Sequence, residues 1–352
     1  MMSFTLADFD YHLPPELIAQ HPTPQRADSR LMVVDRVSQT WQHYTFSELP
    51  DILHSIDFLV LNDTRVFPAR LHGRKASGGR VEILLHHLPE PLNHESSPHA
   101  ARAQVNYRGH RLKVGQVLHF DNGLEGEITA ILGGGVAEVQ FRSGQGNVVQ
   151  AVLGQGEVPL PPYIRRTPEA QDQERYQTVY AAQPGAIAAP TAGLHFTPEV
   201  LDSLKNRGIE TATVTLHVGP GTFLPVRTMD YTQHQMHPEY FMLPAATATR
   251  LNQAQAAGLH LVAVGTTSVR VLEHCASPQG FTPREGWCSL YIYPGYHFQA
   301  VDHLLTNFHL PKSTLLLLVA AFAGRDLILA AYEDAIQNHY RFYSYGDCML
   351  IV

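Results

Sequence analysis

The order of elements in this chain is set by two motifs, Ala189-Pro-Thr-Ala-Gly-Leu-His-Phe196 and Leu216-His-Val-Gly-Pro-Gly-Thr-Phe223. Between them, Thr197-Pro198-Glu199 predicts the start of a helix and Gly208 its end. The β-branched run at 211–217 then predicts a strand. If this strand has parallel neighbours, both histidine-bearing loops converge at one edge of a sheet, where α/β proteins bind their ligands.

The same alternation of strands and helices continues toward the C-terminus. Residues 259–264 predict a buried strand, and Gly265-Thr-Thr-Ser268 leads directly into a helix. Further strands are predicted at 289–293 and 349–352, and helices after Ser313 and at 325–339. Near the N-terminus, Pro14-Pro15-Glu16 predicts a short helix, and strands are expected at 31–35 and 58–61. These parts predict an α/β domain.

A different pattern occupies residues 66–156, where short alternating runs are separated by glycine-rich turns such as Gly133-Gly-Gly135. Closely spaced strands of this kind predict a small antiparallel β-barrel or sandwich, of which we expect the barrel. The turn residues Asn62-Asp-Thr-Arg65 suggest a crossing between domains. We therefore expect an α/β domain made of residues 1–65 and 157–352, with a β-barrel domain of residues 66–156 inserted into it.

Composition limits the class of protein. The chain has 352 residues, 44% of them hydrophobic and 16% charged, which is typical of a globular protein. Its longest apolar run, 315–323, is shorter than the roughly 20 residues that span a bilayer, and no signal peptide is evident. We expect a cytoplasmic protein without a membrane segment. The three cysteines and 21 histidines form no compact ligand motif, so no metal is expected.

Charge is distributed unevenly along the chain. The formal net charge is −7, yet residues 65–113 carry nine basic side chains against three acidic ones. Such a basic segment is able to attract phosphate groups, and Arg65, Arg70, Arg74 and Lys75 are its candidates for contacts with RNA. An ordinary solvated surface remains the alternative, and Arg65 and Arg70 are equally able to bridge the two domains through ion pairs.

Several polar motifs are candidates for a binding site. Gly265-Thr266-Thr267-Ser268 joins a strand to a helix, where free N–H groups bind anions, although a plain helix cap has the same pattern. Tyr293 and Tyr296 bracket a tight turn that offers a ring for stacking or simply packs. Histidine titrates near neutral pH, which makes four histidines candidates for proton transfer: His195, His217, His237 and His309.

These motifs together resemble a known family. With Gly265-Thr-Thr-Ser-Val-Arg270, Leu305-Thr-Asn-Phe-His-Leu-Pro-Lys-Ser-Thr314 and Tyr343-Ser-Tyr-Gly-Asp347, the chain is similar to the S-adenosylmethionine:tRNA ribosyltransferase-isomerases of queuosine biosynthesis. The resemblance extends from Asp8-Phe-Asp10 through Pro159-Leu-Pro-Pro-Tyr-Ile164 to the C-terminus. It implies a two-domain architecture with an inserted β-domain.

The resemblance also implies an activity. The family transfers the ribosyl part of S-adenosylmethionine to the aminomethyl group of a 7-deazaguanine at the tRNA wobble position, forms epoxyqueuosine, and releases adenine and methionine. The implied co-substrate is S-adenosylmethionine, the partner is tRNA, and we expect a monomer. His195 or His217 is then expected to act as the base, and His309 to lie near the adenine or the amine. The residues expected to bind S-adenosylmethionine are Thr191, Gly193, Gly219, Thr222, Gly265, Thr266, Thr267, Ser268, Arg270, Tyr293, Tyr296 and Asn307.

Two other functions remain open from the sequence. A non-catalytic RNA-binding protein would use the basic segment alone, but it would not need so many pocket-type motifs. A conventional methyltransferase would use the same co-substrate, yet the chain lacks a convincing glycine-rich loop paired with a later acidic residue. The chain departs from the family pattern at three places: Pro220, Lys312 and the segment 106–110. Pro220 bears on the flexibility of its loop, Lys312 is given no catalytic role, and the segment 106–110 bears on the contacts with RNA.

Overall fold

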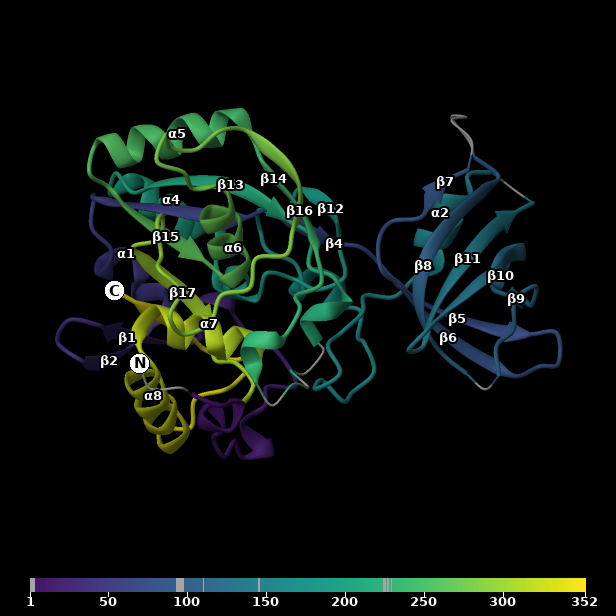
Figure 1. The fold of residues 1–352 in the computed structure, drawn as a ribbon, viewed down its shortest axis with the longest axis horizontal. Coiled ribbons are helices and arrows are strands. Elements are labelled where there is room, and N and C mark those ends of the chain that lie inside the picture. Colours follow the sequence, from purple (N-terminus) through teal and green to yellow (C-terminus); the bar gives the residue numbers. More distant parts are fainter. Residues whose placement is uncertain are drawn as a thin grey trace.

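The structure is a computed structural model. It describes residues 4–92, 98–109, 111–144, 146–223, 226, 228 and 230–352, but not the side chains of Thr222 and Phe223. Two bodies of secondary structure are visible in Figure 1: a mixed sheet with helices, and a β-barrel at one side of it. This confirms the predicted fold class, an α/β domain with a small antiparallel β-barrel.

The larger body is built on a nine-stranded sheet. Its strands, in spatial order, are β16 (Arg284–Cys288), β14 (Glu239–Leu243), β13 (Glu210–Leu216), β3 (Asp57–Asn62), β15 (His260–Val264), β17 (His303–Asn307), β18 (Cys348–Ile351), β1 (Arg30–Asp35) and β2 (Thr40–Thr45). The four central strands β13, β3, β15 and β17 are parallel. Their carboxyl ends therefore point to the same edge of the sheet.

Helices cover both faces of this sheet. On one face the core includes apolar side chains from α5 (Ala245–Ala256), α6 (Thr266–Cys275), α7 (Thr314–Ala323) and α8 (Arg325–Gln337). On the other face α1 (Leu49–Ile52) and α4 (Pro198–Asn206) pack against the strands. Central strand residues such as Val60 and Val262 are almost fully buried, as expected for parallel strands that are covered on both sides.

The smaller body is a closed barrel. Strands β5 (Arg70–Lys75), β6 (Arg80–Leu85), β8 (Ala100–Arg108), β9 (Val117–His119), β10 (Leu124–Gly133) and β11 (Val136–Ser143) form it, and β7 (Glu90–Pro91) pairs outside β8. Pairing of β11 with β8 closes the ring. The barrel has its own core, to which α2 (Val148–Gln155) contributes Val148 and Val152. Gly73 is required there, because a Cβ atom would lie 2.7 Å from the Phe120 ring.

The connection between the two bodies runs through β4 (Thr64–Val66), which pairs with β12 (Gln183–Ala186). Just before it, the Asn62 side chain binds the backbone of Leu216 through both its oxygen and its nitrogen. The pair of β4 and β12 is a small sheet of its own; the strands of the mixed sheet come from before β4 and from β13 onward, and the strands from β5 to β11 belong to the barrel. The boundaries 1–65, 66–156 and 157–352 stay a prediction.

Most of the predicted elements are present. The helix after Thr197 is confirmed: the threonine hydroxyl accepts from Val200 N at 3.3 Å, and Gly208 has the positive φ of 78° that ends a helix. Ser313 caps α7 in the same way. The remaining short elements are α3 (Asp172–Arg175), η1 (Leu6–Phe9), η2 (Pro15–Leu17), η3 (Arg26–Asp28), η4 (Phe46–Glu48), η5 (Asp121–Gly123), η6 (Thr191–His195), η7 (Pro220–Phe223) and η8 (Tyr231–Gln233).

One predicted strand is wrong. Residues 289–293 are rich in strand-forming side chains, but the strand is β16, which lies just before them and pairs with β14. The segment 289–293 instead forms hydrogen bonds outside the sheet: the Leu290 carbonyl accepts from Arg270 Nε, and the Tyr291 hydroxyl donates to the Tyr231 carbonyl. Strand propensity was overridden by these tertiary contacts.

No single helix among the described residues is long and apolar enough to cross a membrane. The helices α7 and α8 reach that length and apolar character only together, and they are bent by 114° at their junction.

Candidate active site

Polar residues follow the carboxyl ends of all four parallel strands. His217 follows β13, Asp63 and Thr64 follow β3, Thr266 comes two residues after β15, and His309 comes two residues after β17. Since these ends lie at one edge of the sheet, the expected convergence of the loops is present. Asn307, the last residue of β17, contacts His195 there: its amide nitrogen lies 3.2 Å from His195 Nε2.

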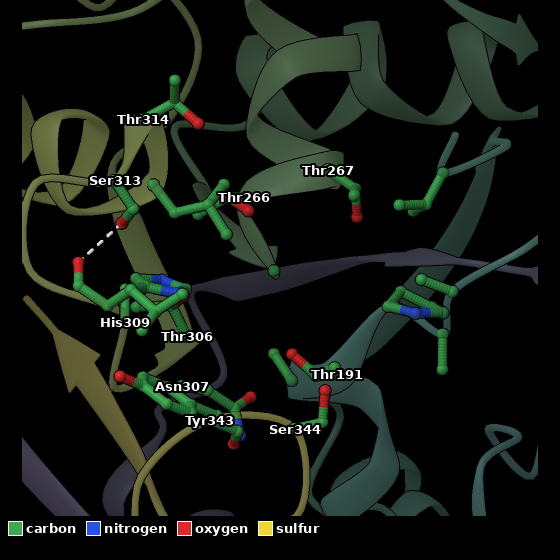
Figure 2. Close-up of a pocket in the computed structure, with 18 of the residues that line it drawn as sticks. Thr191, Thr266, Thr267, Thr306, Asn307, His309, Ser313, Thr314, Tyr343 and Ser344 are labelled. Atoms are coloured by element: carbon green, nitrogen blue, oxygen red, sulfur yellow. Dashed lines mark hydrogen bonds between the residues drawn. The ribbon is translucent and has the colours of Figure 1, made fainter. Parts of the chain in front are cut away.

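A cavity opens at this edge, with about 1070 Å³ of empty space that includes part of the open solvent. Most of its wall comes from segments that are far apart in sequence, 188–192, 265–267, 306–310, 313–315 and 343–344, and further residues such as Tyr163, Tyr176 and Glu239 complete it. In Figure 2, Thr266 and Thr267 lie at the start of a helix on one side, and Asn307, Tyr343 and Ser344 lie opposite them.

The amino end of α6 forms one wall. Gly265 has a φ of 86° there, a backbone conformation that favours glycine. Because glycine has no side chain, no side chain at this position caps the helix. Thr266 and Thr267 face the cavity, and within the described residues Thr267 Oγ1 is buried without a hydrogen-bond partner. Ser268 points elsewhere, because its hydroxyl donates to the Val264 carbonyl at 2.8 Å. This end of the helix therefore offers free N–H groups and hydroxyls to an anion.

Arg270 and Glu239 form a buried ion pair in the wall. The guanidinium also donates to the carbonyls of Leu290 and Cys288, and Glu239 accepts from Gly219 N at 2.9 Å. Arg270 is thus already neutralised, so the charge available to a ligand comes mainly from the helix end. Gly219 takes part through its backbone, outside the cavity wall.

Asn307 and His309 contribute polar groups from β17 and the loop that follows it. Asn307 donates to the Tyr343 carbonyl at 3.0 Å, while its Oδ1 atom is buried and has no partner among the described residues. His309 Nε2 lies 2.8 Å from the Thr306 hydroxyl, and the His309 backbone contacts the hydroxyls of Tyr11 and Tyr332. Burial lowers the pKa of His309 to about 3, so the imidazole is uncharged at neutral pH.

His195 lies behind this wall. It is 3% exposed and packs on Phe46, and burial lowers its pKa to about 3. It reaches the cavity only through its contact with Asn307. Gly193 is needed for packing in the same turn, because a Cβ atom there would lie 2.1 Å from the Tyr180 hydroxyl. Thr191, in contrast, lines the cavity.

Three tyrosines that the sequence did not single out form an aromatic side of the cavity: Tyr163, Tyr176 and Tyr343. The rings of Tyr163 and Tyr343 lie 4.7 Å apart, and Tyr343 has a φ of 72°, which is strained for a bulky residue. Both lie within motifs that carry the family resemblance, Pro-Leu-Pro-Pro-Tyr-Ile164 and Tyr343-Ser-Tyr-Gly-Asp347. Tyr343's unusual conformation is not readable from sequence.

The predicted tyrosines lie elsewhere. Tyr293 packs edge-on against Tyr231, and the Tyr296 hydroxyl donates to Glu273. Neither lines the cavity. In this structure the turn between them packs through aromatic contacts, and a role of either tyrosine in binding S-adenosylmethionine stays a prediction.

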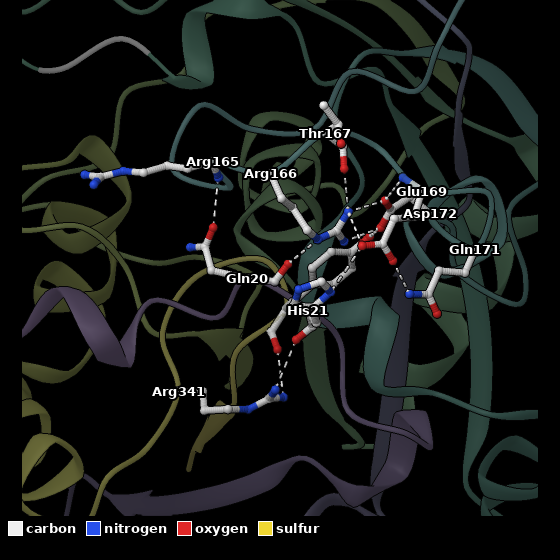
Figure 3. A network of polar contacts seen from close by, with 10 residues as sticks. Gln20, His21, Arg165, Arg166, Thr167, Glu169, Gln171, Asp172 and Arg341 are labelled. Carbon is white, nitrogen blue, oxygen red and sulfur yellow. Dashed lines mark hydrogen bonds and ion pairs between the residues drawn. The ribbon is translucent and has the colours of Figure 1, made fainter.

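A polar network holds the aromatic side in place (Figure 3). Arg166 donates two bonds, of 2.6 and 2.7 Å, to the buried Asp172 carboxylate, which also accepts from the Tyr345 hydroxyl. Burial alone would raise the pKa of Asp172, but the bonds from Arg166 and its other donors lower it. Arg341 joins the same region by donating to the carbonyls of His21 and Tyr345. The network fixes the segments on either side of Tyr163 and Tyr343.

His217 lies outside the cavity wall. Its Nδ1 atom is 2.8 Å from the Thr64 hydroxyl, and its ring stacks on Tyr240 at 5.7 Å. Burial lowers the pKa of His217. His237 is exposed and packs beside Gly221. The Thr222 side chain lies outside the described residues.

The candidates for RNA contact lie on β4 and β5. Arg65 and Arg74 are exposed, and Arg74 pairs directly across the barrel sheet with Arg80, another cation. Like charges in this position are unfavourable unless an anion compensates them. Lys75 follows on the same strand and is half-buried. Arg70 lies 3.7 Å from Glu82 and donates to the Leu160 carbonyl, so it joins the barrel to the segment that returns from it.

Comparison with known proteins places this geometry in a family. Residues 6–351 match the family model described as queuosine biosynthesis protein. The S-adenosylmethionine:tRNA ribosyltransferase-isomerase of Natranaerobius thermophilus is 49% identical over 98% of this chain and 99% of its own length. That of Syntrophotalea carbinolica is also 49% identical, over 99% of each chain.

A solved structure agrees with these matches. The crystal structure of an S-adenosylmethionine tRNA ribosyltransferase from Thermotoga maritima is 36% identical, covers 98% of this chain and 100% of its own, and superposes with a TM-score of 0.56. The similarity therefore includes the barrel as well as the mixed sheet. The chain belongs to the S-adenosylmethionine:tRNA ribosyltransferase-isomerase family of queuosine biosynthesis.

Proposed function

We propose that this enzyme transfers the ribosyl part of S-adenosylmethionine to the aminomethyl group of a 7-deazaguanine at the tRNA wobble position. The product is epoxyqueuosine in the tRNA, and adenine and methionine are released. The observation that carries the proposal is the cavity at the carboxyl ends of the strands, where Asn307 Oδ1 and Thr267 Oγ1 have no partner within the described residues. Buried polar atoms of this kind are normally satisfied by a ligand or water.

Two sides of the cavity suit S-adenosylmethionine. The amino end of α6, with Thr266 and Thr267, fits the methionine carboxylate, because Arg270 is already paired with Glu239. The aromatic side formed by Tyr163, Tyr176 and Tyr343 fits the sulfonium or the adenine ring, since aromatic faces attract cations and stack on bases. Thr191, between them, is a further hydroxyl for the ribose.

The chemistry needs three proton movements at most. The sulfonium acidifies the C5′ protons of the ribose, so a base generates an ylide there; the amine must be uncharged to attack; and the departing adenine takes up a proton. Of the four histidines that the sequence makes candidates for proton transfer, His309 is the one that lines the cavity. We therefore assign the direct contact with substrate to His309. Burial keeps its imidazole neutral, and the Thr306 hydroxyl, 2.8 Å from Nε2, fixes the ring.

His195 and His217 as bases stay a prediction. His195 Nε2 lies 3.2 Å from the Asn307 amide nitrogen, which supports a positioning role for His195 as the alternative to that of the base. His217 is bound to Thr64, at the entry to the barrel. Transfer RNA carries one phosphate per nucleotide, and we place the exposed cations Arg65, Arg74 and Arg80 on the side that attracts it.

The first test is to incubate the protein with S-adenosylmethionine and tRNA that carries the aminomethyl-deazaguanine, and to follow adenine release together with the mass of the modified nucleoside. Release of adenine with an epoxyqueuosine mass is expected. S-adenosylhomocysteine in place of adenine would identify a methyltransferase, and binding without either product would leave an RNA-binding protein. Both outcomes contradict the proposal.

The same assay tests the role of His309. We expect His309→Gln to lower kcat by about 10²- to 10⁴-fold, the usual contribution of a positioned proton-transfer group. His297→Gln is the matched control, because His297 is exposed and lies outside the cavity wall. A folded His309→Gln protein with unchanged kcat would remove His309 from the reaction.

A further inference from the structure

Three side chains meet at the opposite edge of the sheet, where the central strands begin. Asp57, His260 and His303 are the first residues of β3, β15 and β17. These strands are neighbours, and the pairing of His260 with Asp57, and of Val262 with His303, brings the three side chains together. Each contributes one potential metal-ligand atom, and the three atoms lie within 4.8 Å of one another.

The separations fit a common coordination geometry. His260 Nδ1 lies 3.5 Å and His303 Nε2 3.8 Å from Asp57 Oδ1, and the two imidazole nitrogens are 3.2 Å apart. In a tetrahedral zinc site with bonds of about 2.0–2.1 Å, neighbouring ligand atoms are about 3.3 Å apart. The three atoms therefore need to move by only a few tenths of an ångström to share one ion.

The carboxylate is held in the orientation that a ligand needs. Asp57 Oδ2 accepts from His54 N at 2.7 Å, which leaves Oδ1 facing the two histidines. The Asp57 side chain is 5% exposed and that of His303 17%, but that of His260 is 43% exposed. The site thus has a fixed buried side and an open side, through which an ion enters and a water molecule completes the coordination.

The surrounding charges permit a divalent ion and set its affinity. Arg36 and Asp302 are the other charged groups near His303, and Arg36 donates to the Asp302 backbone carbonyl. His303 Nδ1 is buried without a partner among the described residues. Because the outer contact that usually fixes a ligating histidine is missing there, we expect micromolar rather than nanomolar affinity.

We propose that Asp57, His260 and His303 bind one zinc-class divalent transition-metal ion. The site ties together the amino ends of three strands whose carboxyl ends carry Asn62, Gly265 and Asn307. A strand rises about 3.3 Å per residue, so the site lies about 16 Å from the cavity, and the ion has a structural role apart from the reaction. This inference does not depend on the proposed function.

The test uses the full chain, freed of metal with a chelator, and titrates it with Co²⁺ while the visible absorption is recorded. Zn²⁺ is then added to displace the cobalt. We expect one Co²⁺ per chain with the strong bands of a four- or five-coordinate nitrogen and oxygen site, displaced by one Zn²⁺. In His303→Asn and His260→Asn, we expect at least a tenfold weaker apparent affinity and loss of these bands.

A matched control accounts for the many other histidines. His339→Asn removes an exposed histidine far from the cluster at a position whose φ of 55° suits asparagine, and its titration should match that of the wild type. Thermal unfolding gives a second measurement: excess Zn²⁺ should raise the midpoint by several degrees in the wild type and in His339→Asn, but not in His260→Asn. If the His260 and His303 variants keep the wild-type cobalt spectrum, or the wild type binds no ion, the site does not exist.

Discussion

The two ends of the central strands are built in different ways. At the carboxyl ends, contiguous motifs such as Gly265-Thr-Thr-Ser268 and Thr306-Asn-Phe-His309 supply several cavity residues each. At the amino ends, Asp57, His260 and His303 each come alone from a different strand. A ligand pocket needs backbone as well as side chains, and backbone is shaped by neighbouring residues. A cluster of ligand atoms needs only one side chain from each strand.

The two ends also differ in how charge is balanced. Beside the cavity, Arg270 and Glu239 form a direct pair with 6% and 5% side-chain exposure. At the opposite edge, Asp57 is equally buried, but its partners are a backbone N–H group and two histidines. Removing a charge should therefore cost much more at the cavity than at the amino ends.

The largest effect is expected for Arg270→Met. The change leaves the Glu239 carboxylate buried without its cation, and breaking such a pair costs about 3–5 kcal/mol. Asp57→Asn, which keeps an acceptor for His54 N, should cost about 1 kcal/mol in metal-free protein. Urea unfolding followed by circular dichroism measures both values. The control is Arg250→Met, whose pair with Glu210 is solvent-exposed, and for which about 0–1 kcal/mol is expected. Equal costs at the two ends would contradict the comparison.

The local structure around the cavity end could be predicted from the sequence, for physical reasons, whereas the cluster of Asp57, His260 and His303 could not, because each residue comes from a different strand. The helix after Thr197, the turn at Gly265 and the cap at Ser313 rest on local hydrogen bonds and backbone conformations, which neighbouring residues determine. Whether 284–288 or 289–293 forms the strand depends on which segment pairs with β14, and this tertiary contact cannot be predicted from the local sequence. In the structure, 284–288 forms the pairs with β14.

The candidate site divides in the same way. Thr191, Thr266, Thr267, Asn307 and His309 line the cavity because their motifs end at the strand edge. The sequence does not show, however, how far a side chain lies from the cavity. His195 contacts Asn307 but does not itself line the cavity. The direction of a tyrosine ring is equally hidden, which is why Tyr343 was missed although its motif was recognised.

A second, smaller effect is the dependence of stability on pH that the two buried histidines at the cavity end produce. Burial lowers the pKa of His195 and His309 to about 3, from the ordinary histidine value of about 6.5. Below pH 6.5 the unfolded chain binds protons at these two positions and the folded chain does not, so their contribution is complete above pH 6.5 and is lost as the pH falls toward 3. Each histidine should contribute a slope of about 1.4 kcal/mol per pH unit, or about 2 kcal/mol at pH 5.

Urea unfolding between pH 7 and pH 5 measures this slope. Replacing one of the two buried histidines, as in His309→Gln, should reduce this slope by the contribution of one histidine. Comparison with each variant's own value at pH 7 removes the effect of the substitution itself. An identical slope in wild type and His309→Gln would mean that this histidine is protonated in the folded protein as readily as in the unfolded chain.

The smallest effect is expected on the barrel, which lies apart from both strand ends. Arg74 is exposed and directly opposite Arg80, so a phosphate group that binds between them relieves their repulsion. Arg74→Ala should raise KM for tRNA about three- to tenfold with little change in kcat, and should reduce the slope of log KM against log salt by about 0.9. Lys205→Ala removes an exposed cation from α4 and should leave both quantities unchanged. If Arg74→Ala lowers kcat and leaves the salt slope intact, the barrel acts on the reaction through the arrangement of the two domains and not through a phosphate contact.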